Sequence, residues 1–194
     1  MKKLVLSILA ATLAGSLLAE TDGALWAVAK TAQHPQPTPD IRGFGATLFN
    51  SEVGNFSGLE LGIGHTRVKG NLCGAEFNVV MACTDGDCYG FQSACACKIS
   101  GELHGTQMGA VNTVKSLAAG LQFGYVNDAD VMGGKGKGAV QAGLVNYADT
   151  MASGGLQIGI FNQVDQFKGG LQIGFVNLLP DTDIPFCVIV NGCF

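Results

Sequence analysis

The chain has 194 residues, a formal net charge of −4, 29 glycines and an apolar fraction of 47%. Many glycines with few charges occur in low-complexity chains, but this apolar fraction indicates a packed interior, and the length indicates one domain. Two of the 11 positive charges lie at Lys2 and Lys3, and the others form no basic patch. We therefore expect no nucleic-acid partner.

Residues 1–19 have the composition of a secretory signal peptide. Lys2 and Lys3 precede an apolar run from Leu4 to Ala14, and the stretch Gly15–Ala19 (GSLLA) follows, with Leu17 bulkier than the residue usually found two places before the cut. The apolar run is too short to span a bilayer, so we expect cleavage after Ala19 and no transmembrane helix in the mature chain. This predicts export to the cell surface, the periplasm or the extracellular space.

Residues 20–42 are expected to form an N-terminal cap and a connector. Leu25–Val28 is apolar and suits a first strand. The segment Gln33–Asp40 carries proline at every second position, which prevents regular strand pairing and favours extended chain. We interpret this segment as a surface connector.

The rest of the chain is built from repeats. The octet Gly155–Asn162 (GLQIGIFN) returns 15 residues later as Gly170–Asn177 (GLQIGFVN). The same frame gives nine copies, which start at residues 43, 58, 74, 90, 105, 120, 139, 155 and 170. Such a period is typical of a repeat architecture. The repeat domain then covers residues 43–179, and residues 180–194 form a C-terminal cap with a degenerate tenth copy at Ile184–Asn191.

The octet pattern predicts which side chains are buried. Positions 2, 4 and 6 are apolar, which indicates a strand that buries these three side chains. Position 3 is Glu60 or Glu76 in early copies and glutamine later, and a carboxylate is rarely buried unpaired, so we expect position 3 to face solvent. Asparagine at position 8 suits a corner, because it tolerates a left-handed backbone. Linker residues such as Val114 and Leu117 predict a second, shorter strand.

These features predict an all-β fold, a solenoid of about nine to ten coils of 15–16 residues. Three buried side chains at about 1.5–3 kcal/mol each do not offset the ordering of about fifteen residues at roughly 1–2 kcal/mol each, so coils must stack. Stacked amides then form ladders between coils. The expected ladder residues are Asn112, Asn127, Asn146, Asn162, Asn177, Gln157 and Gln172. An antiparallel β-meander or barrel is the alternative, and a small outer-membrane β-barrel is a further one.

The seven cysteines leave disulfide pairing open in an exported chain. Cys83 and Cys88 flank a turn, and Cys187 with Cys193 is a second candidate pair. A competing zinc site would use Cys83, Cys88, Cys95 and Cys97. No Cys-x-x-Cys pair is present, and Cys95 falls on an octet position where cysteine acts as a small apolar residue. We therefore predict no metal site and no cofactor.

No arrangement of catalytic residues is evident. The three histidines are His34, His65 and His104. Asp128 and Asp130 are more typical of a solvated turn than of a calcium site, because regularly placed aspartates are absent. Some parallel β-helices cleave polysaccharides, and Glu60 with Glu76 is the only carboxylate stack in the octets. We predict no catalytic residues and keep a polysaccharide-active enzyme as the alternative.

Position 7 of the octet is a candidate interaction stripe. It is apolar at Phe49, Val80, Val111, Val126, Val145, Phe161 and Val176. We predict that glycine at position 5 bends the strand and turns position 7 inward, since this removes an exposed apolar surface. If the strand stays straight, the stripe is larger than a soluble monomer normally exposes. It would then be a face for self-association or for an unknown protein, glycan or envelope surface.

The tandem GLQxGxxN unit behind a signal peptide resembles the surface-repeat proteins described from Leptospira and found in other bacteria. The stretch Ala24–Trp26 and the ending Pro185–Phe194 are similar to that family's flanks, so the resemblance covers residues 24–194. Copies three and four depart from the unit, with Asn78 and Ala94 in place of glycine. The resemblance implies an exported, non-enzymatic surface or envelope protein that acts as a structural or binding scaffold and has no catalytic residues to carry over.

Overall fold

The computed structural model describes residues 22–28, 38, 40–134, 137–183 and 185–193. All regular elements in these ranges are strands of one 13-stranded sheet system. They are β1 (Asp22–Val28), β2 (Ile41–Thr47), β3 (Asn50–Val53), β4 (Phe56–Gly62), β5 (His65–Val68), β6 (Leu72–Asn78), β7 (Met81–Thr84), β8 (Cys88–Ser93), β9 (Ala96–Met132), β10 (Ala139–Met151), β11 (Gly155–Phe167), β12 (Gly170–Leu178) and β13 (Phe186–Cys193). The predicted signal peptide and most of the proline-rich connector lie outside the described residues.

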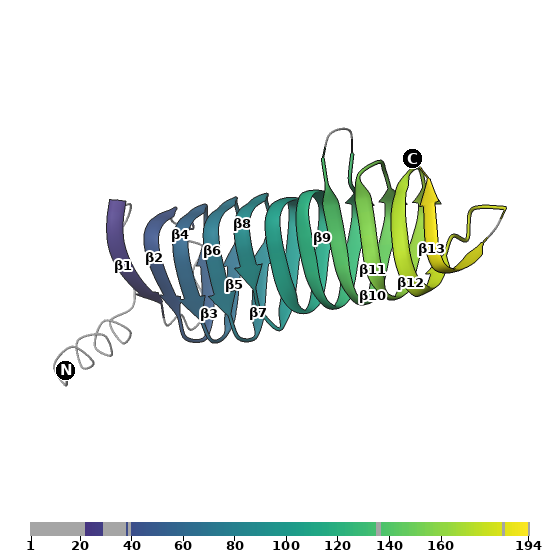
Figure 1. Ribbon diagram of the computed structural model, residues 1–194. Coiled ribbons are helices and arrows are strands. Elements are labelled where there is room, and N and C mark those ends of the chain that lie inside the picture. The colour runs from purple at the N-terminus through teal and green to yellow at the C-terminus, as the bar shows by residue number, and fades with distance from the viewer. Residues whose placement is uncertain (1–21, 29–37, 39, 135–136, 184, 194) are drawn as a thin grey trace.

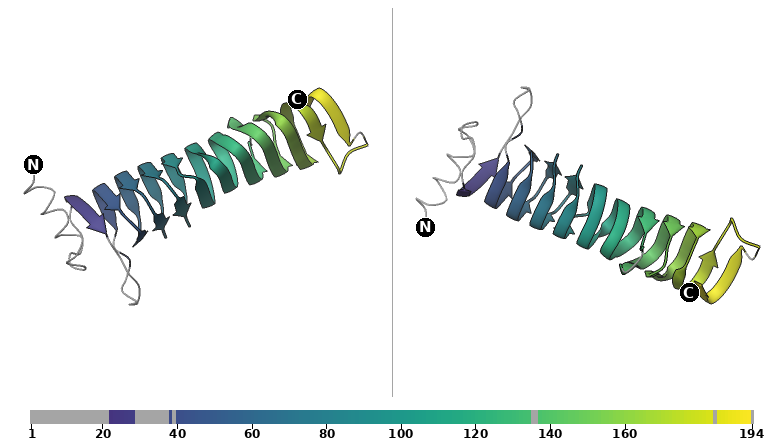
Figure 2. Two further views of the ribbon diagram at one scale, coloured as in Figure 1. Left: turned by 90° about the horizontal axis from the view of Figure 1, so that it is seen from below. Right: turned by 90° about the horizontal axis from the view of Figure 1, so that it is seen from above.

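The chain winds into a straight rod of stacked coils (Figures 1 and 2). Each coil pairs in parallel and in register with the next, so that Ile41 lies opposite Phe56 and Phe56 opposite Leu72. The short strands β3, β5 and β7 stack on the return side in the same way. The predicted β-solenoid is confirmed, but it has about eight turns and not the nine to ten coils that were expected. The antiparallel meander or barrel is wrong, because consecutive coils are parallel.

The sequence repeats and the structural repeats coincide. Gln157 lies opposite Gln141 on one side and Gln172 on the other, as the octet frame requires. The 19-residue spacing between copies six and seven holds an insertion that projects from the rod (Figure 1), and within it Gly134 bridges to Lys137. The coils on either side remain in register, since Ala139 lies opposite Gly120. A solenoid tolerates such an insertion because it leaves the stacking of neighbouring coils intact.

The two ends of the rod differ. β1 extends the stack in parallel with β2, which confirms the strand predicted at Leu25–Val28. β13 instead runs antiparallel to β12, so the degenerate tenth copy does not form another coil. Among the described residues there is no helix with the length and apolar character needed to cross a bilayer.

The burial pattern within the octet is the reverse of the prediction. Gln157 and Gln172 are fully buried, whereas Ile158 is 42% exposed and Ile173 is 37% exposed. Positions 3, 5 and 8 point inward, and positions 2, 4, 6 and 7 point outward. The prediction was wrong because it treated amides and carboxylates as solvent-facing groups, while stacking supplies each buried amide with a partner in the next coil.

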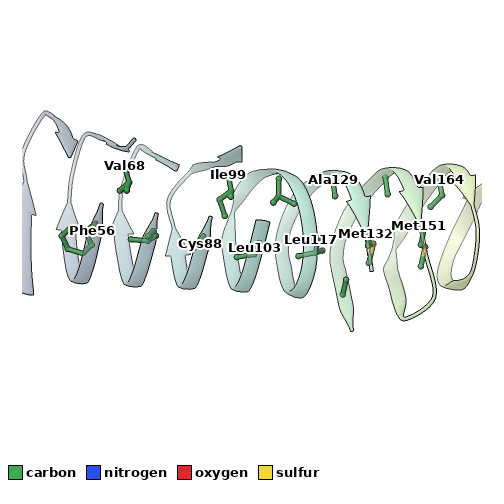
Figure 3. Close-up of a cluster of buried hydrophobic side chains, with 14 of the residues drawn as sticks. Phe56, Val68, Cys88, Ile99, Leu103, Leu117, Ala129, Met132, Met151 and Val164 are labelled. Carbon is green, nitrogen blue, oxygen red and sulfur yellow. The ribbon is translucent and has the colours of Figure 1, made fainter. Parts of the chain in front are cut away.

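The apolar core comes from the linkers. Val114 and Leu117 are fully buried, and so are their equivalents in neighbouring coils. Figure 3 shows these side chains following one another along the inside of the coils. Its labelled members are Phe56, Val68, Cys88, Ile99, Leu103, Leu117, Ala129, Met132, Met151 and Val164. The hydrophobic core is therefore shared between the short strands, such as β5 with Val68, and the first residues of the long strands, such as Phe56 of β4 and Leu72 of β6.

Candidate functional site

A ladder of buried glutamine side chains runs along the interior. Nε2 of Gln172 donates to Oε1 of Gln157 at 2.9 Å, and Nε2 of Gln157 donates to Oε1 of Gln141 at 2.8 Å. The ladder continues in the same direction through Gln122 to Gln107. Nε2 of Gln141 also donates to the main-chain oxygen of Tyr147, 3.0 Å away. Both N–H groups of such an amide are satisfied, which removes the usual penalty for burying it.

A second ladder, of asparagines at position 8, runs in the opposite direction. Nδ2 of Asn146 donates forward to Oδ1 of Asn162 at 2.8 Å, and Asn162 donates likewise to Asn177. Nδ2 of Asn146 also donates to the main-chain oxygen of Ile158 in the next coil at 2.9 Å. These asparagines do not form left-handed corners, because Ile189 is the one described non-glycine residue with a positive φ. The predicted ladders therefore exist, but inside the solenoid.

The glycine at position 5 is explained by the main chain of the preceding coil together with the asparagine ladder, since a Cβ on Gly124 would lie 2.0 Å from the main-chain oxygen of Gly109. A Cβ on Gly124 would lie 2.5 Å from Nδ2 of Asn112, and a Cβ on Gly159 would lie 2.5 Å from Nδ2 of Asn146. The asparagine of one coil thus fills the space beside position 5 of the next coil. Sequence reasoning missed this coupling, although glycine and asparagine occur together in copies five to nine.

The early copies replace the asparagine ladder with other side chains. Ser51, Thr66, Ala82 and Cys97 stack in the inward column that asparagine occupies later. In the first three copies this places the inward residue one position after Asn50, His65 and Met81, which the octet frame assigned to position 8. Position 5 is then free to carry a buried side chain, Thr47 in copy one and Asn78 in copy three.

The glutamine ladder ends on two stacked, buried glutamates. Nε2 of Gln92 donates to Oε2 of Glu76 at 3.1 Å, and Nδ2 of Asn78 donates to its Oε1 at 2.7 Å. Glu60 lies opposite Glu76 in the next coil, and its Oε1 accepts a bond from Thr47 Oγ1 at 2.9 Å. Oε2 of Glu60 is buried without a hydrogen-bond partner among the described residues.

Burial determines the ionisation of this pair. Desolvation, followed by the nearby carboxylate of Glu60, raises the pKa of Glu76 to about 8. Desolvation also raises the pKa of Glu60. The two side chains were expected in solvent, and that expectation is wrong because Glu60 is 2% exposed and Glu76 is fully buried. Neither carboxylate can reach a polysaccharide, so the stack that supported the enzyme alternative is not an accessible site.

The outward side chains of the octets form one uncharged surface, which we call the apolar face. It comprises positions 2, 4, 6 and 7 of nine copies, and none of these 4 × 9 = 36 residues is charged. Several are large and well exposed, including Phe123 at 52%, Tyr125 at 67% and Phe175 at 72%. The charged residues of the solenoid other than Glu60 and Glu76 lie in the linkers. The rod is therefore amphipathic around its circumference.

The predicted stripe at position 7 belongs to this face. Phe49, Val80, Val111, Val126, Val145 and Phe161 are exposed, and Val176 is half-buried. The inward turn that we predicted is wrong. The chain turns a corner between positions 5 and 8, so the side chains at positions 6 and 7 both point outward.

The linker side of the rod carries the ion pairs and an acidic group. Arg67 pairs with Asp85 at 2.9 Å, and Lys69 pairs with Glu52 at 3.1 Å. Asp130 and Asp149 lie near Asp128, and burial followed by these two carboxylates raises the pKa of Asp128. No group of three or more His, Cys, Asp or Glu side chains within the described ranges is arranged to hold a metal ion.

The six described cysteines are not disulfide-bonded. Cys88 lies in the apolar core between Leu72 and Leu103, so the predicted bond to Cys83 is not formed. Burial raises the pKa of Cys88 to about 12. The competing zinc site is not assembled either, because Cys97 is buried while Cys95 lies exposed on the apolar face. The Cys187–Cys193 pair involves a side chain outside the described residues.

No protein-family model, no curated protein and no solved structure matches the chain. The resemblance to surface-repeat proteins therefore depends on the octet motif and its flanking segments.

Proposed function

We propose that the mature protein is an exported, non-enzymatic scaffold of the cell surface or envelope, and that it binds through the apolar face. The observation that carries this proposal is the absence of charge from all 36 outward octet positions. Nine rows at about 4.8 Å and five residue steps at about 3.3 Å give a face on the order of 700 Å². A typical monomer exposes contiguous apolar patches of only a few hundred Å².

Folding alone does not require this surface to be apolar. The interior is filled by the linker residues and the two amide ladders, so Ile158 and its neighbours contribute nothing to the core. Strand propensity favours isoleucine and valine on the outside of a sheet. It does not account for Leu144 or Met108, which are 48% and 40% exposed. A binding role explains why Leu144 and Met108 are apolar, whereas the stability of the fold does not.

The proposal of export is supported by the leader at residues 1–19. Mass spectrometry of the protein recovered from its own cells should find an N-terminus at Glu20. An intact Met1 on a cytosolic protein would contradict export. Incubation of the purified chain with polysaccharides should release no new reducing ends, and release would instead support the enzyme alternative.

Binding through the apolar face is tested by two double variants that each add two positive charges, one on the face and one on the linker side. Val145 and Phe161 are register partners on the face, and Thr150 and Gln166 are register partners on the linker side of the same two coils. We expect Val145→Lys with Phe161→Lys to fold and be exported but to be released from the envelope fraction. The matched control, Thr150→Lys with Gln166→Lys, should remain there. Equal retention of both variants would contradict the proposal.

A further inference from the structure

We infer that the apolar face packs against the same face of a second copy, with the two rods antiparallel. This inference rests on the proposed function and names the partner of that face.

The face has a hollow next to a ridge. An open hollow of about 460 Å³ lies over copies four to seven, and small residues such as Ser93 and Ala110 are part of its lining. Phe123 and Tyr125 of copy six border the hollow and are 52% and 67% exposed. A second copy turned over about the centre of the hollow brings the two hollows together, and Phe123 and Tyr125 of each copy then enter the shared space.

A two-fold axis parallel to the strands, between copies five and six, produces this fit. It places copy six over copy five, copy seven over copy four and copy nine over copy two, with each octet position over the same position. Tyr125 then lies over Ala110 of the second copy, and Val145 lies over Ala96, so a large side chain meets a small one at these two positions. Phe123 lies over Met108, which is itself 40% exposed. The axis is near the middle of the nine copies, so eight of the nine rows overlap. Such an interface is isologous and closes as a dimer.

The sheets have the geometry that this contact requires. Two sheet faces pack about 10 Å apart with their strand directions within about 30° of each other, and this axis leaves the strands of the two copies parallel. Eight overlapping rows of this face cover on the order of 600 Å², which is at the lower end of the roughly 600–1,000 Å² per partner of a standard stable interface. Because none of the 36 outward octet residues is charged, closing this interface desolvates no ion.

Charge favours a second copy over a lipid surface. After removal of the leader, 11 − 2 = 9 basic residues remain against 15 acidic ones. Membrane surfaces that carry anionic lipids attract basic segments, and a rod with this excess of acidic residues is repelled from them. A second copy instead covers the face while both acidic linker sides stay in water.

Sedimentation of the purified mature chain over a range of concentrations tests the inference. We expect the native chain to be a dimer and Tyr125→Lys to raise the dissociation constant about a hundredfold or more, because the symmetry buries the new charge twice. Gln166→Lys, on the exposed linker side, is the matched control and should dimerise like the native chain. A native chain that stays monomeric, or a Tyr125→Lys dimer of unchanged affinity, overturns the inference.

A cross-link tests the orientation. The exposed Cys95 of copy four faces Leu144 of copy seven in the second molecule, and within one molecule these residues are three coils apart. Under mild oxidation, Leu144→Cys should form a covalent dimer through Cys95, whereas Gln166→Cys should not. Failure of the Leu144→Cys link in a dimer excludes this arrangement. If the native chain is monomeric but the face variant still leaves the envelope fraction, the self-pairing fails and the proposed function stands.

Discussion

The side-chain amide of Asn146 occupies the space that a Cβ would need at Gly159 in the next coil. The distance from Nδ2 of Asn146 to an ideal Cβ at Gly159 is 2.5 Å, which no real Cβ contact allows. The same Nδ2 donates to Asn162 and to the main chain of Ile158. The glycine and asparagine of the motif therefore form one structural unit shared between consecutive coils.

This coupling predicts that Gly159→Ala is strongly destabilising. We expect a loss of about 2–4 kcal/mol in the free energy of unfolding, because the asparagine or the backbone must shift. Asn146→Ala alone should cost about 2 kcal/mol by breaking the ladder. The double variant should cost less than the sum, since the smaller side chain relieves part of the clash. Gly138→Ala, where a Cβ meets no atom within 4 Å, is the control and should be nearly neutral. Strict additivity of the two changes would contradict the coupling.

The burial of the glutamines is tested by replacing one with an apolar residue of similar shape. Gln157→Met should lower the free energy of unfolding by about 2–4 kcal/mol, because Oε1 of Gln141 and Nε2 of Gln172 lose their partner. Ile158→Ser, one residue later on the outer surface, should cost less than about 1 kcal/mol. Denaturant titration of both variants measures the difference. A larger loss of stability for Ile158→Ser than for Gln157→Met would show that Ile158 is buried and Gln157 is exposed.

The buried glutamate pair predicts that stability falls as pH rises. Glu76 has a folded pKa of about 8 against an ordinary value of 4.5, so the folded state holds its proton more tightly than the unfolded state. The contribution of this proton is present at low pH and is lost as pH rises from about 4.5 to about 8. Glu76→Gln extends the glutamine ladder and should flatten this slope, adding on the order of 4 kcal/mol above pH 8. Glu52→Gln, on the exposed surface, should leave the slope intact, and an unchanged slope in Glu76→Gln would rule out the buried pair.

Cysteine labelling distinguishes the inside of the rod from the outside. Cys73 is exposed, whereas Cys88 and Cys97 are buried with pKa values raised to about 12 by desolvation. Because the thiolate is the reactive form, an alkylating reagent should modify Cys73 in the native protein and should modify Cys88 and Cys97 only after unfolding. Peptide mass spectrometry identifies the sites. Rapid labelling of Cys88 in the native protein would show that the hydrophobic core is accessible to solvent.

The sequence allowed the period, the parallel stacking and the amide ladders to be predicted, but not the side on which the ladders lie. A two-residue alternation is the same for both faces of a strand, so the choice between them depended on the rule that apolar residues are buried. Here the rule holds for Val114 and Leu117 in the linker and fails for Ile158 in the octet.

A different signal in the sequence was available. Position 3 is glutamine in six consecutive copies, while position 4 varies from Ser93 to Phe123 and Ile173. A ladder requires the same residue in each coil, whereas an outer surface accepts many. Uniform identity, more than hydrophobicity, marks the inside of this solenoid. The relief of the apolar face could not be predicted, because it depends on which side chains of different copies become neighbours.

The most direct test of the inverted interior is hydrogen exchange of the side-chain amides, followed by NMR after transfer to heavy water. We predict that the Nε2 protons of Gln157 and the Nδ2 protons of Asn162, both buried in ladders, persist long after those of the exposed Gln166 have exchanged. This measurement does not depend on whether the apolar face is free or paired. Exchange of Gln157 as fast as that of Gln166 would place the glutamines on the outside and contradict the account.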